Sequence, residues 1–416
     1  HCWRTDKPIL YYPLDSWFIK TTNYRDLLIK KNKEINWKPK STGEGRFQNW
    51  LENINDWNLS RSRFWGIPLP IWKTKDETEF ICVGSLEELK ELCETSVSCG
   101  NMASNPLDGF VCGDMSDSNY DVFDLHKNFV DKIVLSSKDG SPMYRETDVI
   151  DVWFDSGSMP YAQWHYPFEN KDLIDSGTFF PADFIAEGVD QTRGWFFTLH
   201  AISVMCFNQL AFKNVISNGL VLDSLGQKMS KRLGNSVEPF EVIRKHGADS
   251  VRWYMISNSQ PWDNLKFDIG GVIDIKSRFF STIYNTYSFF SLYANIDGFR
   301  YCEDVVSVSD RPVLDQWVLS ELNTLVRVVD DYYSNYEPTQ ASRAIQSFVI
   351  EKLSNWYVRL CRRRFWKGVY DKSKVSAYQT LYDCLVTIAK LSSPIAPFFM
   401  DRLFCDLNNW TGKETV

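Results

Sequence analysis

The sequence predicts an α/β region followed by an all-α region, and two patterns of apolar residues indicate this fold class. Between residues 146 and 236, short apolar runs alternate with one long apolar helical stretch, an order typical of a parallel sheet crossed by helices. After residue 271, apolar residues recur every three to four positions, which predicts a helical bundle. A chain of 416 residues is too long for one core, so we expect about two to four domains.

The composition is that of a globular protein. Hydrophobic residues make up 44% of the chain and charged residues 24%. The net charge of −7 argues against indiscriminate binding of nucleic acid but allows a local basic surface. The most apolar stretch, residues 195–212, includes His200, Asn208 and Gln209, which favours a buried core helix over a membrane span. Because no secretory signal is evident, we expect a cytoplasmic protein. We also expect a monomer without membrane contact.

The first 145 residues are expected to form two parts. Residues 1–72 alternate short apolar runs with proline and glycine turns, which suggests strands and loops packed on a catalytic core. Residues 73–145 are more polar and read as a connective insertion, with a helix over 85–92 that has Ser85 as its N-cap. This insertion holds Cys82, Cys93, Cys99 and Cys112, but their gaps of 11, 6 and 13 residues do not match the short spacing of structural zinc sites. No metal site is therefore predicted.

Residues 146–236 carry the α/β pattern. We expect a strand over 148–154, a strand over 182–186 followed by a helix from about Asp190 to Asn208, and short strands over 214–217 and 220–222. In a parallel sheet, ligands bind beyond the carboxyl ends of the strands. The peptide 187–191 lies at such an end, although its pattern alone favours an ordinary turn with Asp190 as the helix N-cap.

A lysine loop follows the last of these strands. Gly226 and Gly234 flank Lys228 and Lys231, just after a turn-forming Asp223-Ser224. Two ammonium groups beside a polyphosphate would offset the charge that builds on a leaving pyrophosphate. The alternative is a solvated surface loop, because two lysines three residues apart are common.

The rest of the chain is expected to be helical. A helix over 237–247 has Pro239 in its first turn and Gly247 as its stop, and bundle helices are predicted over 313–333, 339–367 and 374–391. On the second of these, one face carries a basic and aromatic cluster formed by Arg359, Arg362, Arg363 and Trp366. This face is either a solvated cationic surface or a site that contacts RNA phosphates and stacks on bases.

Several segments, taken in order, resemble the isoleucyl-tRNA synthetases, a family within the class I aminoacyl-tRNA synthetases. Lys228-Met-Ser-Lys-Arg232 resembles the signature loop of the whole class, which the valine, leucine and methionine enzymes share. The ordered set is more specific, and it comprises residues 1–5, 46–53, 56–72, 151–157 and 186–195. The segment 155–161 favours isoleucine over valine.

The resemblance implies a domain order. Residues 1–72 would be the catalytic segment that follows an editing insertion, 73–145 a connective insertion, and 146–236 the second half of a Rossmann-like catalytic domain. Stem-contact helices would follow over 237–300. A helical-bundle anticodon-binding domain would occupy residues 301–416.

The resemblance also implies the chemistry and its residues. The intact protein would activate L-isoleucine with ATP and Mg²⁺ to isoleucyl-adenylate and then transfer it to tRNA(Ile). Lys228 and Lys231 would be catalytic. The adenylate-binding residues would be Glu187, Gly188, Asp190, Gln191, Lys228, Met229, Ser230 and Lys231. The amino-acid pocket would contain Trp153, Gln191 and Trp195, and tRNA would contact Arg359, Arg362, Arg363 and Trp366.

One motif of the class is missing. The five histidines include no His-x-Gly-His arrangement, which the class places near the start of its nucleotide fold. We therefore expect a piece of a longer protein that is inactive by itself. Two alternatives stay open, a valyl-tRNA synthetase and a catalytically incomplete tRNA-binding fragment.

Overall fold

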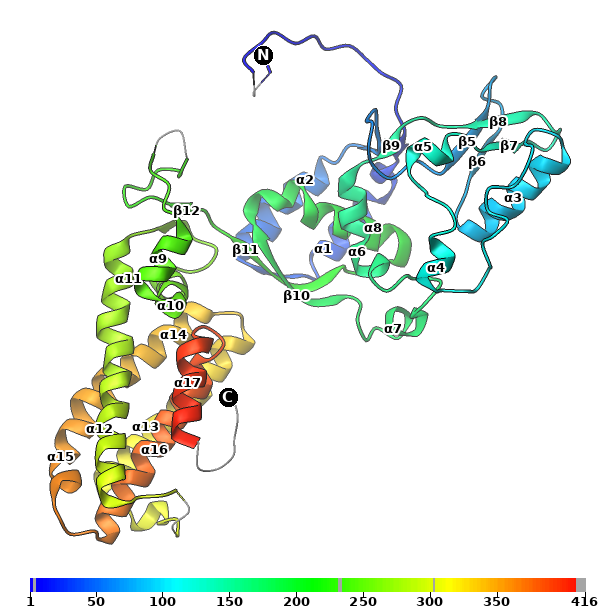
Figure 1. The fold of residues 1–416 in the computed structure, drawn as a ribbon. Coiled ribbons are helices and arrows are strands. Elements are labelled where there is room, and N and C mark those ends of the chain that lie inside the picture. Colours follow the sequence, from blue (N-terminus) through cyan, green and yellow to red (C-terminus); the bar gives the residue numbers. More distant parts are fainter. Residues whose placement is uncertain (3–4, 231–233, 302–303, 409–416) are drawn as a thin grey trace. The chain divides into compact units, whose positions relative to one another are not determined.

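The protein is described here by a computed structural model, which covers residues 1–416 apart from 3–4, 231–233, 302–303 and 409–416. The described residues form two compact units. One comprises residues 1–185 and 190–215, and the other comprises residues 186–189 and 216–416. Figure 1 labels their helices and strands.

The first unit combines helices with short strands. Its helices are α1 (Arg25–Asn32), α2 (Gln48–Glu52), α3 (Leu86–Ser98), α4 (Asp117–Tyr120), α5 (Lys127–Val130), α6 (Val152–Ala162), α7 (Lys171–Asp175) and α8 (Trp195–Phe207). Its strands are β1 (Phe18–Ile19), β2 (Asn36–Lys38), β3 (Trp57–Asn58), β4 (Ser60–Arg61), β5 (Ile71–Thr74), β6 (Phe80–Cys82), β7 (Val134–Ser136), β8 (Pro142–Arg145) and β9 (Val149–Ile150). Two longer strands, β10 (Ala182–Gly188) and β11 (Phe212–Asn218), run on into residues of the second unit.

Residues 71–145 share one hydrophobic core. Strands β6, β5, β8 and β7 form, in that order, an antiparallel sheet. Trp72 is buried in this core, and its indole N–H donates to the Ile133 carbonyl at 3.0 Å. Helix α3 lies against this sheet, and the Ser85 hydroxyl accepts from the Glu88 N–H at 3.1 Å, so the predicted N-cap is confirmed.

The other main core of this unit lies around α8. Strands pair in the order β10-β11-β2, and aromatic rings of Trp37, Phe196 and Phe212 meet edge to face or tilted beside them. The residues of α8 from Phe196 to Val204 are buried, so the predicted core helix is confirmed.

Three local predictions were wrong in this unit. Residues 148–154 do not form one strand, because β9 ends at Ile150 and helix α6 begins at Val152, where the Asp151 carboxylate caps the Trp153 N–H. A short apolar run fits a strand or a helix start equally well, so periodicity could not separate them. Asp190 is not the N-cap of the next helix, since residues 189–193 form a 3₁₀ turn and Gly194 caps α8. Residues 1–72 also contain α1 and α2, besides strands and loops.

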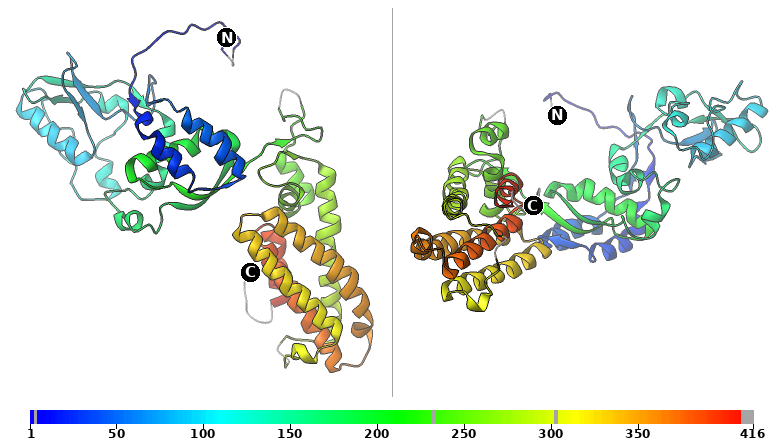
Figure 2. Two further views of the ribbon diagram at one scale, coloured as in Figure 1. Left: turned by 180° about the vertical axis from the view of Figure 1, so that it is seen from behind. Right: turned by 60° about the horizontal axis from the view of Figure 1, so that its bottom comes forward.

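The second unit is mainly helical (Figures 1 and 2). Its helices are α9 (Pro239–His246), α10 (Ala248–Asn258), α11 (Ile269–Ile275), α12 (Ser281–Asp297), α13 (Val313–Ser334), α14 (Pro338–Ser347), α15 (Arg359–Trp366), α16 (Lys372–Ser392) and α17 (Pro397–Asn408). A short parallel pair joins β12 (Val221–Leu222) to β13 (Leu265–Lys266). The predicted start and stop of α9 are confirmed, with Pro239 in its first turn and Gly247 at a φ of +86° after its last.

Long helices of this unit pack around one large core. Helices α12, α13, α15 and α16 contribute apolar side chains to it, and the core also includes Trp253 of α10. The predicted helix over 339–367 is interrupted, because residues 348–358 are π-helical between α14 and α15. No helix among the described residues is both long and apolar enough to cross a bilayer.

Candidate functional site

Helices α6 and α8 place Trp153 and Trp195 close together in the first unit. Trp153 is the second residue of α6 and is 42% exposed, so it is not a core residue. Trp195 opens α8 and is half-buried, and its indole N–H donates to the Ser156 carbonyl of α6 at 2.9 Å. A Cβ atom at Gly194 would lie 3.6 Å from Cη2 of Trp153. The ring of Trp153 therefore reaches the start of α8, beside Trp195.

Gln191 is held at the same place by two hydrogen bonds. Its side-chain oxygen accepts from the backbone N–H of Trp195 at 2.9 Å, and its side-chain nitrogen donates to the Asp190 carboxylate at 3.1 Å. A side chain on Gly194 would collide with the Gln191 oxygen, because its Cβ would lie only 2.7 Å away. A side chain at 194 would therefore displace the Gln191 amide from this position. Within the described residues, one amide hydrogen of Gln191 has no acceptor.

A buried carboxylate fixes the start of α6. Asp151 is 4% exposed, and its carboxylate accepts from the Trp57 indole at 3.1 Å and pairs with the Arg61 guanidinium at 2.9 Å. These contacts tie α6, and with it Trp153, to β3 and β4. Nearby, burial and the Asp151 charge raise the pKa of Asp155.

The segment before Asp190 is exposed or partly exposed. Glu187 and Gly188 end strand β10, and the Glu187 side chain is exposed. The predicted position at the end of a strand is therefore confirmed for both residues. Their contact with a nucleotide stays a prediction.

The lysine loop in the second unit is held by Asp223 and Asn235. The Asp223 carboxylate accepts from the Gln227 N–H at 2.7 Å and from the Asn235 amide at 2.8 Å, and these bonds lower its pKa, with the Asn235 bond as the largest cause. The Asn235 side chain also accepts from the Ser230 N–H at 2.9 Å. Lys228 is exposed, and Met229 packs on a small core. Lys231 lies outside the described residues.

Sequence reasoning missed Lys266 beside this loop. The β12–β13 pair brings Lys266 opposite Leu222, and a Cβ atom at Gly226 would lie 3.1 Å from the Lys266 Cε atom. Strand β13 has only two residues, so no periodic signal in the sequence indicated this approach.

The basic cluster of the bundle divides into two kinds of arginine. Arg359, Arg362 and Arg363 are exposed on α15, together with Trp366, which is 56% exposed. Arg364 instead turns inward and donates to the fully buried carboxylate of Asp315 at 2.8 Å. The shared exposed face is therefore confirmed, and Arg364 stabilises the bundle.

No group of three or more His, Cys, Asp or Glu side chains in the described part of the chain could hold a metal ion. Of the four cysteines of the insertion, Cys93 is buried in the core, which raises the pKa of its thiol to about 11, whereas the other three are exposed.

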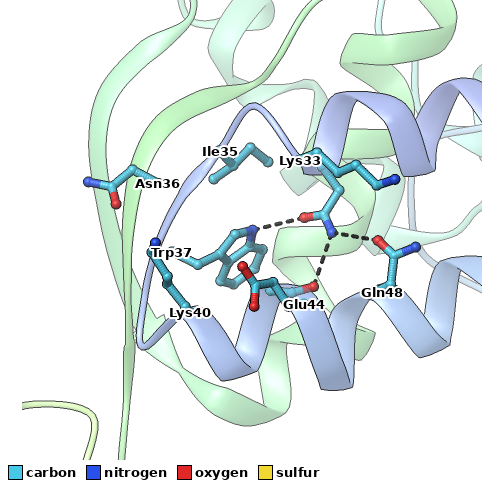
Figure 3. Close-up of a pocket in the computed structure, with 9 residues that line it drawn as sticks. Lys33, Ile35, Asn36, Trp37, Lys40, Glu44 and Gln48 are labelled. Carbon is cyan, nitrogen blue, oxygen red and sulfur yellow. Dashed lines mark hydrogen bonds between the residues drawn. The ribbon is translucent and has the colours of Figure 1, made fainter.

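A cavity of about 410 Å³ lies away from the predicted site residues (Figure 3). It is formed by the end of α1, β2 and the turn that follows. Some of its polar groups bind one another: the Trp37 indole donates to Asn32 at 2.8 Å, and the Asn32 amide donates to the Gly43 carbonyl and to Gln48. We assign this cavity no role in the candidate site.

Two family descriptions match the chain. Residues 6–268, more than half of it, match "tRNA synthetases class I (I, L, M and V)". The chain belongs to the class I tRNA synthetases. Residues 315–415 match "Anticodon-binding domain of tRNA ligase". For a class I synthetase, a Rossmann-like catalytic part followed by a helical part is the expected order, as the sequence predicted.

Curated relatives of this class I synthetase carry the name isoleucine–tRNA ligase. That of Bacteroides fragilis is 62% identical over 418 residues, which is 100% of this chain and 37% of the relative. Those of Porphyromonas gingivalis and Clostridium acetobutylicum are 62% and 46% identical. The chain thus spans little more than a third of the length of these relatives.

Solved structures share the fold at low identity. The Mycobacterium tuberculosis methionyl-tRNA synthetase bound by methionyl-adenylate has a TM-score of 0.64 and 16% identity, with 96% of this chain and 64% of that chain covered. The Agrobacterium radiobacter LeuRS in its LeuRS–tRNA–LeuAMS complex has a TM-score of 0.58 and 18% identity, with 88% and 44% covered. This likeness concerns the fold alone.

Proposed function

We propose that this chain is part of an isoleucine–tRNA ligase, which activates L-isoleucine with ATP and transfers it to tRNA(Ile). The observation that carries the proposal is the 62% identity, over the whole chain, to relatives named isoleucine–tRNA ligase. The family match supports the reaction class. The activity belongs to the full-length protein, since the chain spans 37% of the relative from B. fragilis.

The residues proposed to contact the amino acid stand at the starts of α6 and α8. Trp153 and Trp195 give two apolar ring surfaces, which suits a substrate side chain made only of methyl and methylene groups. Gln191 is held with a free amide hydrogen at the rim, where it can donate to the polar end of the substrate. One methylene is worth only about 1 to 3 kcal/mol in such a pocket, so valine is the competitor that it excludes least well.

The lysine loop contacts the phosphates of ATP. Lys228 is exposed on a loop that Asp223 and Asn235 hold in shape, and Lys231 follows three residues later in the sequence. Charge on the leaving pyrophosphate grows as the reaction proceeds, so these ammonium groups stabilise the transition state more than the bound ATP. Side chains here position the substrates and neutralise the charge on the phosphates, and none forms a covalent bond with substrate.

The second unit supplies the tRNA contacts. The anticodon-binding match over 315–415 includes α15 with its three exposed arginines and Trp366. Guanidinium groups pair with phosphates, and the indole offers a surface on which a base stacks. The domain limits given for the sequence, with stem-contact helices over 237–300, belong to this proposal.

The test is exchange of pyrophosphate into ATP by the full-length protein that contains this chain. We expect exchange that depends on L-isoleucine, with a kcat/KM for valine lower by roughly 10- to 200-fold. Charging of a tRNA mixture, followed by identification of the acylated species, checks tRNA(Ile). Exchange that prefers valine would assign the chain to the valine enzymes, and exchange with neither amino acid would contradict the proposal.

A further inference from the structure

Helices α6 and α8 lie in tight contact at Gly157. A Cβ atom at this position would lie 2.9 Å from Cδ1 of Ile202 and 3.0 Å from both the backbone carbon and the Cβ of Thr198. The contact with the Thr198 backbone is tight enough that a side chain at 157 would push α8 away by a few tenths of an ångström, because interiors are close-packed. Glycine at 157 therefore lets α6 and α8, which lie side by side in Figure 1, approach each other closely.

The same face of α6 carries Trp153. Residues four apart lie on one face of a helix, so Trp153 and Gly157 both point toward α8. The contacts run along the two helices in one order: Trp153 reaches Gly194, the Ser156 carbonyl accepts from the Trp195 indole at 2.9 Å, and Gly157 faces Thr198. The distance between α6 and α8 at Gly157 thus affects the positions of the two tryptophans, which lie within about one helical turn of it.

We propose that Gly157 is a positioning residue that sets the width of the pocket between Trp153 and Trp195, and so its selectivity for side-chain size. This inference rests on the proposed function, because it takes these tryptophans as the sides of the amino-acid pocket. Gly157 itself touches no substrate. It acts by letting α6 lie close enough to α8 for both rings to contact one branched aliphatic side chain.

A methyl group at 157 would move the rings apart. Dispersion attraction falls steeply with distance, so a shift of a few tenths of an ångström would weaken the contact of isoleucine with one ring. The methylene that distinguishes isoleucine from valine would then be recognised less well, whereas a larger side chain such as that of leucine would fit better. Binding of ATP would be unaffected, because Gly157 acts only on the amino-acid pocket.

The test compares Gly157→Ala with Gly45→Ala in the full-length protein. Gly45 lies in the helical turn Thr42–Phe47, and a Cβ there would meet nothing within 4 Å, so it is a matched control. Pyrophosphate exchange is measured with valine, isoleucine and leucine. For Gly157→Ala we expect the KM for isoleucine to rise and the KM for ATP to stay unchanged. The ratio of kcat/KM for isoleucine to that for valine should fall roughly three- to tenfold. Gly45→Ala should keep the wild-type values.

A folded Gly157→Ala protein with an unchanged ratio would overturn the inference. If this variant fails to fold, the double variant Gly157→Ala/Ile202→Val is measured instead, because valine lacks the Cδ1 atom that stands 2.9 Å away. Crystal structures of the variant and the wild type give a second readout that needs no activity. A wider separation of Trp153 and Trp195 supports the inference, and an unchanged one contradicts it. Absence of exchange in the wild type would instead contradict the proposed function, and the structures would still decide the inference.

Discussion

At the scale of single residues, His200 shows how burial changes a side chain's chemistry. Its imidazole is fully buried in α8, Nε2 lies 2.9 Å from the Leu28 carbonyl, and Nδ1 has no partner in the described part of the chain. Nε2 must therefore carry the hydrogen, since a carbonyl only accepts. Burial lowers the pKa of His200 to about 4, from 6.5, because the charged form would lose its hydration.

This shift predicts a pH dependence of stability. Below pH 6.5 the unfolded chain takes up a proton at His200 before the folded chain does. The free energy of unfolding therefore has its full value above pH 6.5. It falls as the pH drops toward 4, by roughly 3 kcal/mol in total. His200→Gln cannot titrate but keeps a donor for the Leu28 carbonyl. Urea unfolding at several pH values gives the free energy of unfolding as a function of pH. Between pH 6.5 and 4 this free energy should fall less for the variant than for the wild type, and an equal fall would contradict the assignment.

At the scale of elements, α15 separates two uses of arginine on one helix. Arg359, Arg362 and Arg363 lie on its exposed face, and Arg364 lies 20% exposed against Asp315. The direction of each side chain follows from its position on the helix. The segment before α15 is π-helical, which changes the number of residues per turn. The direction in which the exposed face of α15 points therefore depends on a distortion that no sequence periodicity indicates.

If the exposed arginines bind phosphates, tRNA affinity of the full-length protein should depend on salt through them. Each of Arg359→Ala, Arg362→Ala and Arg363→Ala should reduce the slope of log affinity against log salt by roughly 0.7 to 0.9. Filter binding across salt concentrations measures this slope. Arg402→Ala on α17, which removes a surface partner of Asp406, is the control and should change little. A triple variant with unchanged slope would show that this face is only solvated.

At the scale of the whole molecule, the two units have separate cores. Asp315 is fully buried in the second unit and accepts from Tyr357 at 2.9 Å, from Ser376 at 2.6 Å and from Arg364. Removing one partner of such a group leaves the other charge buried and unpaired.

Asp315→Ala should therefore destabilise the second unit by about 3 to 5 kcal/mol and leave the first unchanged. Hydrogen–deuterium exchange, read by peptide, separates the two units in the chain of 416 residues. Asp310→Ala, which breaks an exposed pair with Lys372, is the control and should cost about 1 kcal/mol or less. Faster exchange throughout both units would show that they unfold together.

The sequence by itself determined the features that depend on neighbouring residues. The Ser85 cap, the start and stop of α9 and the glycine turns around the lysine loop follow from local backbone chemistry, and an ordered set of motifs indicated the family. Tertiary packing decided the rest. It made residues 152–162 a helix, brought Trp153 to Gly194, placed Lys266 beside Gly226 and turned Arg364 inward. These contacts join residues far apart in the chain, and their geometry depends on how helices and strands pack, which local patterns do not encode.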